Sequence, residues 1–312
     1  MPEFLAITKY KNPEDGRKGI FQHAHNTQSH VFEWTHQDPK RLNAFNTFMV
    51  GHRQLRPVWF NSFPTDDILF HGPEVDRDAA LIVDIAGGGG YDLEAFRLRF
   101  PHARGRLILQ DLPVVIDGLT DLHKDIMPMK YDFFTPQPIK GMSPVLPYQG
   151  STDVALGARA YYFRTVFHDW SDNKAREILR NTIPAMTEHS KILINEWILP
   201  DVNTPVFPAL QDIQMMAMLS GLERTETQWK ELLKSVGLKV VKFHKVNEES
   251  EGLIEAVKAG WRSLLTTIQA WPWVFLVLVK CARLAFRIRL SDWDAHSTLV
   301  CYGHVEAVDI SC

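Results

Sequence analysis

Apolar and polar residues between positions 81 and 111 are arranged in blocks that predict a strand, a turn, a helix and a second strand. Residues 81–85 form a short apolar run rich in β-branched side chains, as expected of a buried parallel strand. Residues 91–100 place apolar side chains on one helical face and end before a proline. Residues 106–110 form another apolar run, which Asp111 follows. This order predicts the opening β-α-β unit of a parallel sheet.

The pattern continues on both sides of this unit. Upstream, residues 39–49 have the periodicity of a helix, with Pro39 in its first turn. Downstream, the predicted elements are a short helix within 112–122, a strand ending before Asp132, a strand at 160–167, a helix at 173–186, a strand at 191–197, helices at 209–219 and 226–236, and a hairpin of 238–246 and 252–259. We therefore predict an α/β fold with a parallel sheet and a closing antiparallel hairpin.

A glycine-rich turn, residues 86–90, joins the first predicted strand to its helix. Without β-carbons, backbone can approach a ligand closely, and the following helix offers free N–H groups. Asp111 follows Gly90 by 21 positions (111 − 90), the separation at which a carboxylate can bind a ribose. The dinucleotide pattern G-x-G-x-x-G is incomplete, because its third glycine would fall on Asp92 or Leu93. The turn favours a nucleoside without a pyrophosphate, such as S-adenosylmethionine (SAM), with an ordinary α/β turn as the alternative.

Further candidates for chemistry lie at predicted strand ends, where parallel sheets bind ligands. His168 follows the strand at 160–167, and a neutral imidazole is well suited to accept a proton near pH 7, although a structural histidine is the alternative. Glu196 lies at the exit of the next strand, where its carboxylate is expected to face and orient the imidazole. Asp132 and Phe133 end the third strand and can bind an adenine or form an ordinary turn.

Composition narrows the class of protein. The 312 residues are 45% hydrophobic and 23% charged, which is enough for a full core, and the net charge of −3 predicts no nucleic-acid partner. The three cysteines have no metal-ligand spacing, so we expect no metal site and a reducing, cytoplasmic location. No export signal is present, and the most apolar stretch, residues 271–279, is too short to span a membrane. We therefore expect no membrane association.

Taken in order, several motifs resemble those of the plant and fungal small-molecule O-methyltransferases, the caffeate- and flavonoid-type enzymes that use SAM. The resemblance covers about residues 1–259 and rests on DIAGGGG, LQDLP, YDFFTPQP, FRTVFHDWSD, INEWILPD and GLERTETQWKELLKSVGL. It implies a Rossmann-like SAM-dependent methyltransferase domain that methylates a hydroxyl of a phenolic or polyketide-like molecule in secondary metabolism. Two alternatives stay open: a relative that catalyses a non-methylating reaction such as a cyclisation, and a degenerate, inactive SAM-binding protein.

The resemblance also implies roles for individual residues. The cofactor-binding set comprises Gly87 and Gly88 for the methionine part, Asp111 for the ribose, Leu112, Asp132 and Phe133 for the adenine, and Arg164 as a basic position. His168 is implied to deprotonate the substrate hydroxyl. Two carboxylates, Glu196 and Glu223, are implied to bracket that base. No metal is implied.

The chain also departs from the family pattern. The family has most of a winged-helix dimerisation domain before the position of Met1, so we expect an N-terminally truncated member whose residues 1–64 are the helical remnant of that domain. Residues 65–259 are then the SAM-binding domain, with a probable insertion at 142–156 and an atypical tail at 260–312. The family is homodimeric, and the missing segment would carry much of the dimer interface. Ala86 replaces the first glycine of the turn.

Overall fold

The computed structural model describes residues 1–54, 56, 58–70, 78–140 and 157–260. The chain divides into two units, Met1–Ala259 and Gly260–Cys312. The predicted insertion at 142–156, the apolar stretch at 271–279 and all of the predicted tail except Gly260 lie outside the described residues. Within those residues, no helix combines the length and apolar character needed to cross a membrane.

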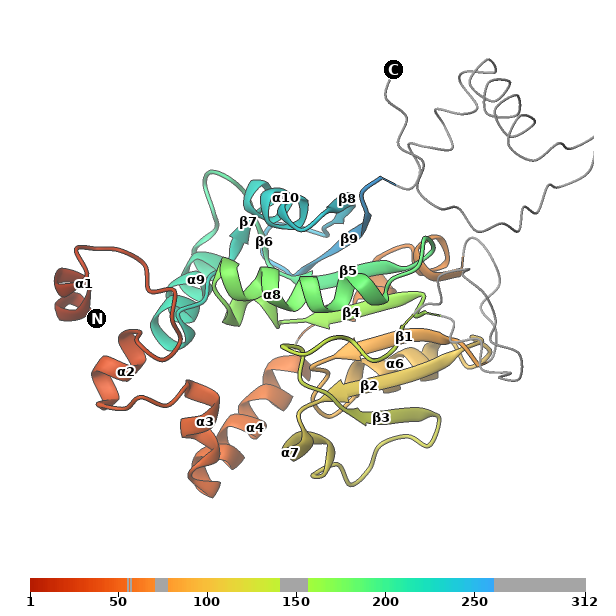
Figure 1. The fold of residues 1–312 in the computed structure, drawn as a ribbon, viewed down its shortest axis with the longest axis horizontal. Coiled ribbons are helices and arrows are strands. Elements are labelled where there is room, and N and C mark those ends of the chain that lie inside the picture. The colour runs from red at the N-terminus through yellow and green to blue at the C-terminus, as the bar shows by residue number, and fades with distance from the viewer. Residues whose placement is uncertain (55, 57, 71–77, 141–156, 261–312) are drawn as a thin grey trace, which may run out of the picture. The chain divides into compact units, whose positions relative to one another are not determined.

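A seven-stranded sheet forms the centre of the first unit, in the order β3-β2-β1-β4-β5-β9-β8 (Figure 1). Its strands are β1 (Ala80–Ile85), β2 (Arg106–Asp111), β3 (Ile126–Lys130), β4 (Ala160–Arg164), β5 (Lys191–Glu196), β8 (Leu238–His244) and β9 (Gly252–Lys258). The first five are parallel, whereas β9 runs antiparallel to both β5 and β8. The predicted α/β fold with its closing hairpin is confirmed. The strand order reverses between β1 and β4, the kind of place where such sheets bind ligands.

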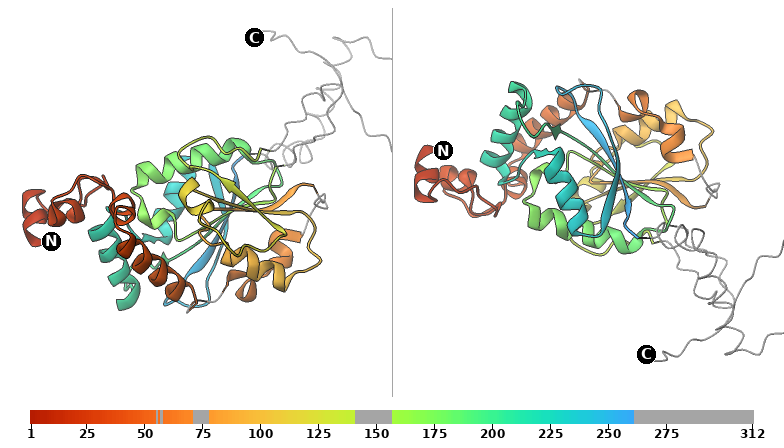
Figure 2. Two further views of the ribbon diagram at one scale, coloured as in Figure 1. Left: turned by 90° about the horizontal axis from the view of Figure 1, so that it is seen from below. Right: turned by 90° about the horizontal axis from the view of Figure 1, so that it is seen from above.

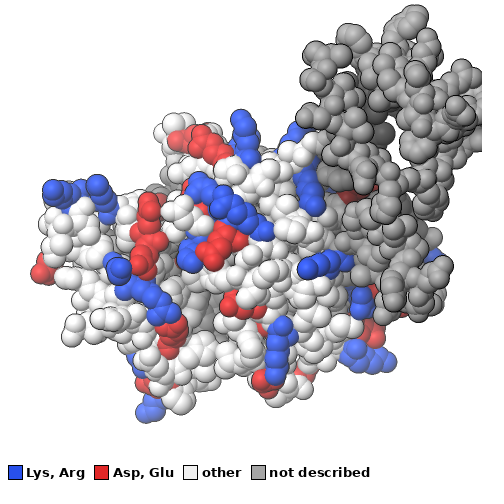
Figure 3. Space-filling view, viewed as in Figure 1, with Lys and Arg blue, Asp and Glu red and all other residues white. Residues whose placement is uncertain are grey.

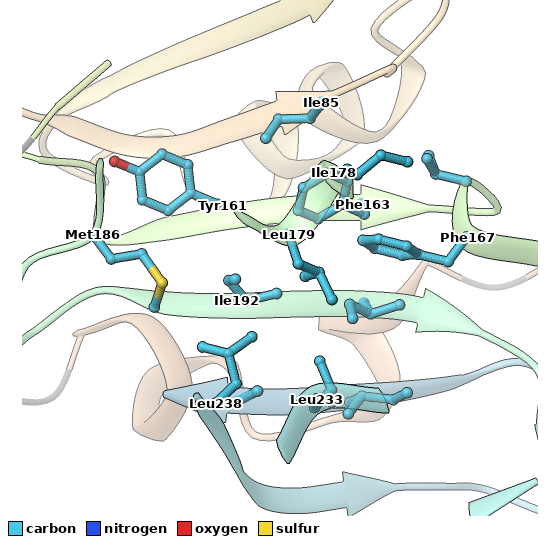
Figure 4. Close-up of a cluster of buried hydrophobic side chains, with 14 of the residues drawn as sticks. Ile85, Tyr161, Phe163, Phe167, Ile178, Leu179, Met186, Ile192, Leu233 and Leu238 are labelled. Carbon is cyan, nitrogen blue, oxygen red and sulfur yellow. The ribbon is translucent and has the colours of Figure 1, made fainter. Parts of the chain in front are cut away.

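Helices cover both faces of the sheet (Figures 1 and 2). On one face, α8 (Asp172–Thr182) and α10 (Glu226–Ser235) pack against β4 and β5, and Figure 4 shows the apolar side chains that meet there. On the other face, α5 (Trp59–Ser62), the π-helix η1 (Asp66–Phe70) and α6 (Tyr91–Arg99) complete a second core. Burial of both faces explains why β1 and β4 are mostly apolar along their length.

The N-terminal helices lie at the end of the sheet toward which the parallel strands run (Figure 1). They are α1 (Pro2–Ile7), α2 (Ile20–His25), α3 (Val31–His36) and α4 (Pro39–Gln54). Phe21 of α2 packs with Met215 of α9 (Val206–Leu219), so these helices form part of the surroundings of the strand ends. The remaining short elements are α7 (Pro113–Ile116), η2 (Phe167–Asp169), η3 (Ile183–Ala185), β6 (Ile198–Leu199) and β7 (Arg224–Thr225). On the face shown in Figure 3, basic and acidic side chains are interspersed.

Around His168 the structure differs from the prediction. The strand expected over 160–167 ends at Arg164, and Thr165 then takes a φ of 47°, in the left-handed region that interrupts a strand. His168 therefore stands on the 3₁₀ turn η2 rather than directly at the end of a strand. Ser171 occupies the N-cap position of α8, but its side chain makes no capping hydrogen bond.

Candidate active site

The glycine turn at the end of β1 is fixed by close packing. The Gly87 N–H donates to the Gln110 carbonyl at 3.3 Å. A β-carbon on Gly87 would lie 2.5 Å from Leu109 Cδ1 and 2.6 Å from Asp84 Cγ, so a larger residue here would have to displace these two side chains. Gly88 has a φ of +58°, and nothing lies within 4 Å of the place of its missing β-carbon. The turn therefore leaves open space beside Gly88.

Ala86 opens this turn with backbone that glycine adopts more readily. Its φ is 60°, and its N–H donates to the Gln110 carbonyl at 2.7 Å. The left-handed conformation costs a residue with a β-carbon roughly 1–2 kcal/mol, because the β-carbon approaches the following carbonyl oxygen. The replacement of the family's glycine by Ala86 thus leaves the turn intact but strained.

Asp111 holds the turn from the end of β2. Its Oδ2 accepts from the Gly88 N–H at 2.8 Å and its Oδ1 accepts from the Leu112 N–H at 2.7 Å. Burial raises the pKa of Asp111, and these two N–H groups oppose that effect. Each carboxylate oxygen keeps a further lone pair for a ligand hydroxyl. Leu112 is 44% exposed, so an apolar surface lies next to the carboxylate. A free carboxylate lone pair beside an apolar surface fits a ribose and its attached base.

Asp132 and Phe133 follow β3, at the same C-terminal end of the parallel strands as Asp111. Asp132 Oδ1 accepts from the Phe134 N–H at 2.9 Å and so fixes the turn locally. The Phe133 ring packs edge-on against Trp170, with 5.9 Å between the ring centroids. Trp170 belongs to the segment that carries His168, so the predicted adenine position and the predicted base are connected by an aromatic contact.

Arg164, predicted to bind the cofactor, is held by carboxylates of the protein. Its Nη1 lies 3.1 Å from Asp92 Oδ1 and its Nη2 lies 2.9 Å from Glu251 Oε2. Burial would lower the pKa of Arg164, but these two carboxylates outweigh that effect and raise it. Asp92 also accepts from Arg53 and, at 2.7 Å, from the Tyr162 hydroxyl. Asp92 thus joins Arg53 of α4 to Arg164 at the end of β4, and the cofactor contact of Arg164 stays a prediction.

His168 is 9% exposed and lies between two carboxylates. Its Nδ1–H donates to Glu223 Oε1 at 2.8 Å, and its Nε2 lies 3.4 Å from Asp169 Oδ1. Burial alone would lower the imidazole pKa, but the charges of Glu223, Asp169 and Glu196 raise the pKa of His168 to about 10. These carboxylates therefore stabilise the protonated form of the imidazole.

Glu196 binds the backbone at the start of η2 rather than the imidazole. Its Oε1 accepts from the backbone N–H groups of Val166, at 2.9 Å, and Phe167. Its Oε2 has no hydrogen-bond partner among the described residues. Burial raises the pKa of Glu196 to about 7, although the positive charge of His168 opposes this. The hydrogen bond that orients the imidazole comes from Glu223 instead, and the predicted role of Glu196 beside the base stays a prediction.

Arg224, which the sequence pattern did not single out, binds the backbone at both ends of η2. Its side chain is fully buried, its Nη1 donates to the Phe167 carbonyl at 2.8 Å, and its Nη2 donates to the Trp170 carbonyl at 2.8 Å. A buried guanidinium with bonded N–H groups fixes backbone strongly. The signal for Arg224 in the sequence was its position directly after Glu223, a predicted site residue.

The segment before Arg224 docks on the backbone of His168. The Leu222 N–H donates to the His168 carbonyl at 3.0 Å, and a β-carbon on Gly221 would lie 2.0 Å from that carbonyl oxygen. Only glycine allows this approach, which brings Glu223 to the imidazole. Among the described residues, no three His, Cys, Asp or Glu side chains are grouped to hold a metal ion.

A cavity of about 280 Å³ adjoins the turn of His168. His30 from the N-terminal helices stacks on Trp170, with the rings 10° from parallel and their centroids 5.1 Å apart. The cavity is lined by Glu14, Asp15, Gly16, Arg17, His30, Asp169, Trp170, Ser171, Lys174, Leu219 and Ser220. It therefore offers both aromatic and charged surface to a small molecule beside the segment that follows His168.

Comparison with known proteins places this geometry in context. Residues 150–239 match the family model of the O-methyltransferase domain. Over 260 residues the chain is 38% identical to O-methyltransferase asqD of Emericella nidulans, a match that covers 82% of this chain and 63% of that protein. It is 34% identical over 257 residues to demethylsterigmatocystin 6-O-methyltransferase of Aspergillus flavus, covering 82% and 61%. The chain thus spans about three fifths of the length of these relatives.

Solved structures with sequence similarity share the fold. The LepI complex with SAM superposes with a TM-score of 0.72 at 31% identity, covering 83% of this chain and 62% of LepI. A structure described as a pericyclic reaction enzyme gives the same TM-score of 0.72. OxaC in complex with S-adenosylhomocysteine (SAH) and oxaline gives 0.67 at 29% identity, covering 83% and 61%.

Proposed function

Since this chain carries a domain of the O-methyltransferase family, we propose that it transfers methyl groups from SAM to small molecules. The acceptor is a hydroxyl group of a phenolic or polyketide-like compound, and His168 is the general base. The observation that carries this proposal is the 2.8 Å hydrogen bond between His168 and the buried Glu223, beside a cavity of about 280 Å³.

The residues at the ends of β1 to β3 fit the cofactor. Backbone at Gly87 and Gly88 would hold the methionine part, and Asp111 would bind the ribose through its free lone pairs. The apolar side chains of Leu112 and Phe133 would cover the adenine, with Asp132 at its edge. When bound, SAM supplies an electrophilic methyl group on a positively charged sulfur.

The protein's own residues prepare the acceptor oxygen. A phenol with a pKa near ~10 is a weak nucleophile at neutral pH. His168 Nε2 takes its proton while Nδ1–H stays bonded to Glu223, which fixes the tautomer and stabilises the imidazolium that forms. General-base help of this kind contributes about 10²–10⁴ in rate. Glu196 and Arg224 act indirectly, because they hold the turn on which His168 stands.

The similarity to a pericyclic reaction enzyme favours a second candidate, a SAM-binding protein that catalyses a non-methylating reaction. The buried Glu223 behind His168 supports methyl transfer over this alternative, since a cyclisation has no need of a stabilised imidazolium.

We further propose that the protein is a homodimer in the cytoplasm and acts on a secondary metabolite. The exposed apolar side chains of Val206, Phe207 and Leu210 on α9 support an oligomeric contact.

A labelling experiment tests the proposed reaction. The 312-residue chain is incubated with CD₃-labelled SAM and a panel of phenols and hydroxylated polyketides, and products are analysed by mass spectrometry. Label in the product for the wild type, lost in His168→Gln, supports methyl transfer with His168 as base. An unlabelled, rearranged product would support the second candidate. SAH binding without any product would point to a degenerate protein.

A further inference from the structure

Asp169 lies next to the imidazole nitrogen that an acceptor hydroxyl would need. Its Oδ1 is 3.4 Å from His168 Nε2, whereas Nδ1 is occupied by Glu223. The Asp169 side chain is 16% exposed, against 11% for His168, and Asp169 lines the cavity beside the turn. A molecule that enters this cavity therefore meets Asp169, whose carboxylate lies next to the imidazole.

Three carboxylates act on His168, each from a different element. Glu223, before β7, has a fully buried side chain and holds Nδ1. Glu196, at the end of β5, accepts backbone N–H groups at the start of η2 through Oε1, and the positive charge of Arg224 counteracts the burial that raises its pKa. Of the three, Asp169 on η2 itself belongs to the cavity wall. It is therefore the carboxylate that can change its contact when a ligand enters, while the other two stay in place.

We propose that Asp169 is a positioning residue that keeps a proton on His168 Nε2 in the free protein and yields this position to the acceptor hydroxyl. The inference rests on the proposed function. On entry of the acceptor, the Nε2 proton passes to the Asp169 carboxylate and from the cavity to water, which leaves a neutral imidazole. The acceptor O–H then donates to Nε2, and its proton moves there as the oxygen–methyl bond forms, the methyl–sulfur bond of SAM breaks and SAH is left.

The ionisation of Asp169 agrees with this role. Burial raises the pKa of Asp169 to about 6, despite the opposing charge of His168. A carboxyl group that takes up protons near neutral pH can accept the Nε2 proton more readily than an exposed aspartate can. The raised pKa of Asp169 therefore lowers the cost of moving a proton to it from the more basic imidazole.

Removal of the Asp169 charge has a defined effect on the free protein. An opposite charge within about 4 Å shifts a pKa by roughly 1–3 units, so Asp169→Asn lowers the His168 pKa by about that much. The acid limb of kcat/KM, which reports the free enzyme, moves to lower pH by the same amount. The plateau value of kcat changes much less, because in the substrate complex the hydroxyl already occupies this place.

The test uses the full chain without cofactor or substrate. The Cε1–H signals of ¹³C-labelled histidine are followed by NMR from pH 6 to 11, and His168→Gln identifies the signal of His168 among the 13 histidines. Asp169→Asn is compared with Asp169→Glu, which keeps the charge, and with Asp121→Asn, which removes an exposed charge elsewhere. We expect a raised His168 pKa in the wild type and in Asp169→Glu, and the same raised pKa in Asp121→Asn. In Asp169→Asn, His168 should bind its proton about tenfold or more weakly, which is a fall of about one pKa unit or more.

Two results overturn the inference. The first is a wild-type His168 that titrates at its ordinary pKa of about 6.5, and this result does not depend on whether any variant folds. The second is a folded Asp169→Asn protein in which His168 has the wild-type pKa. Failure of the proposed function is distinguishable, because absence of labelled methyl transfer would leave these NMR titrations unaffected. Conversely, normal methyl transfer with an unshifted His168 pKa would reject the role of Asp169 alone.

Discussion

The replacement Glu223→Gln removes the charge behind His168 while keeping a hydrogen-bond acceptor. The amide oxygen of glutamine can accept from Nδ1–H at the place of Glu223 Oε1, now 2.8 Å from the ring. Because the side chain is fully buried and similar in volume, we expect the fold to be kept. The change therefore tests the electrostatic contribution of Glu223 rather than its packing.

The size of the effect follows from the ionisation of the imidazole. The pKa of His168 is raised to about 10 by the carboxylates that outweigh its burial, with Glu223 the strongest of them. An adjacent opposite charge accounts for roughly 1–3 pKa units, or about 1.4–4 kcal/mol of imidazolium stabilisation. The imidazolium forms in the transition state of proton transfer, so kcat is expected to fall about ten- to a thousandfold.

The assay compares kcat for transfer of labelled methyl groups near pH 7.5, with thermal unfolding and SAH affinity as controls for folding. Glu226→Gln is the matched control, because Glu226 lies three residues further along and pairs with Lys230 on the surface. It should keep wild-type kcat. A Glu223→Gln protein with normal SAH affinity and kcat within about threefold of wild type would refute the assignment of Glu223 as the partner of the base.

Three further predictions concern the cofactor site, the glycine turn and pH. Asp111→Asn should weaken SAH binding about 10- to 100-fold by calorimetry, because a charge-assisted hydrogen bond is lost, whereas Asp121→Asn should not. Gly87→Ala should lower the free energy of unfolding by about 1–3 kcal/mol in urea, since its β-carbon would lie 2.5 Å from Leu109, while Gly51→Ala, with nothing within 4 Å, should raise it by about 0.5–1 kcal/mol. The raised pKa of His168 stabilises the fold fully below its ordinary 6.5 and is lost as pH rises through about 10, so stability should decline from pH 7 to 10. Glu196, with a pKa of about 7, loses its contribution by the start of that window, and denaturation of His168→Gln should show a flatter pH dependence.

Local periodicity was enough to predict most elements. The apolar run of β1, the turn and the helix α6 were predictable because each is encoded within a few neighbouring residues. The same holds for the closing hairpin of β8 and β9. The predicted strand at 160–167 was too long, because the left-handed backbone of Thr165 is not signalled by the apolar character of its neighbours.

The site was predictable only in part. The order of the motifs indicated that His168 and Glu223 belong together, and the structure joins them at 2.8 Å. The contact of Glu196 with backbone was not predictable, since it depends on how the turn after β4 lies over β5. The pairing of Arg164 with Asp92 depends on the packing of elements that are distant in sequence. Such contacts follow from tertiary geometry, which residue spacing does not specify.

The measurement that tests the central claim most directly is a single-turnover transfer of CD₃ from SAM to an accepted phenol, for wild type and His168→Gln, with both proteins first shown to bind SAH. We predict measurable transfer by the wild type and a rate about 10²–10⁴ lower in His168→Gln at unchanged SAH affinity. Equal rates of transfer in the two proteins, or no transfer by a folded wild type that binds SAH, would contradict the assignment of this site as an O-methyltransferase centre with His168 as its base.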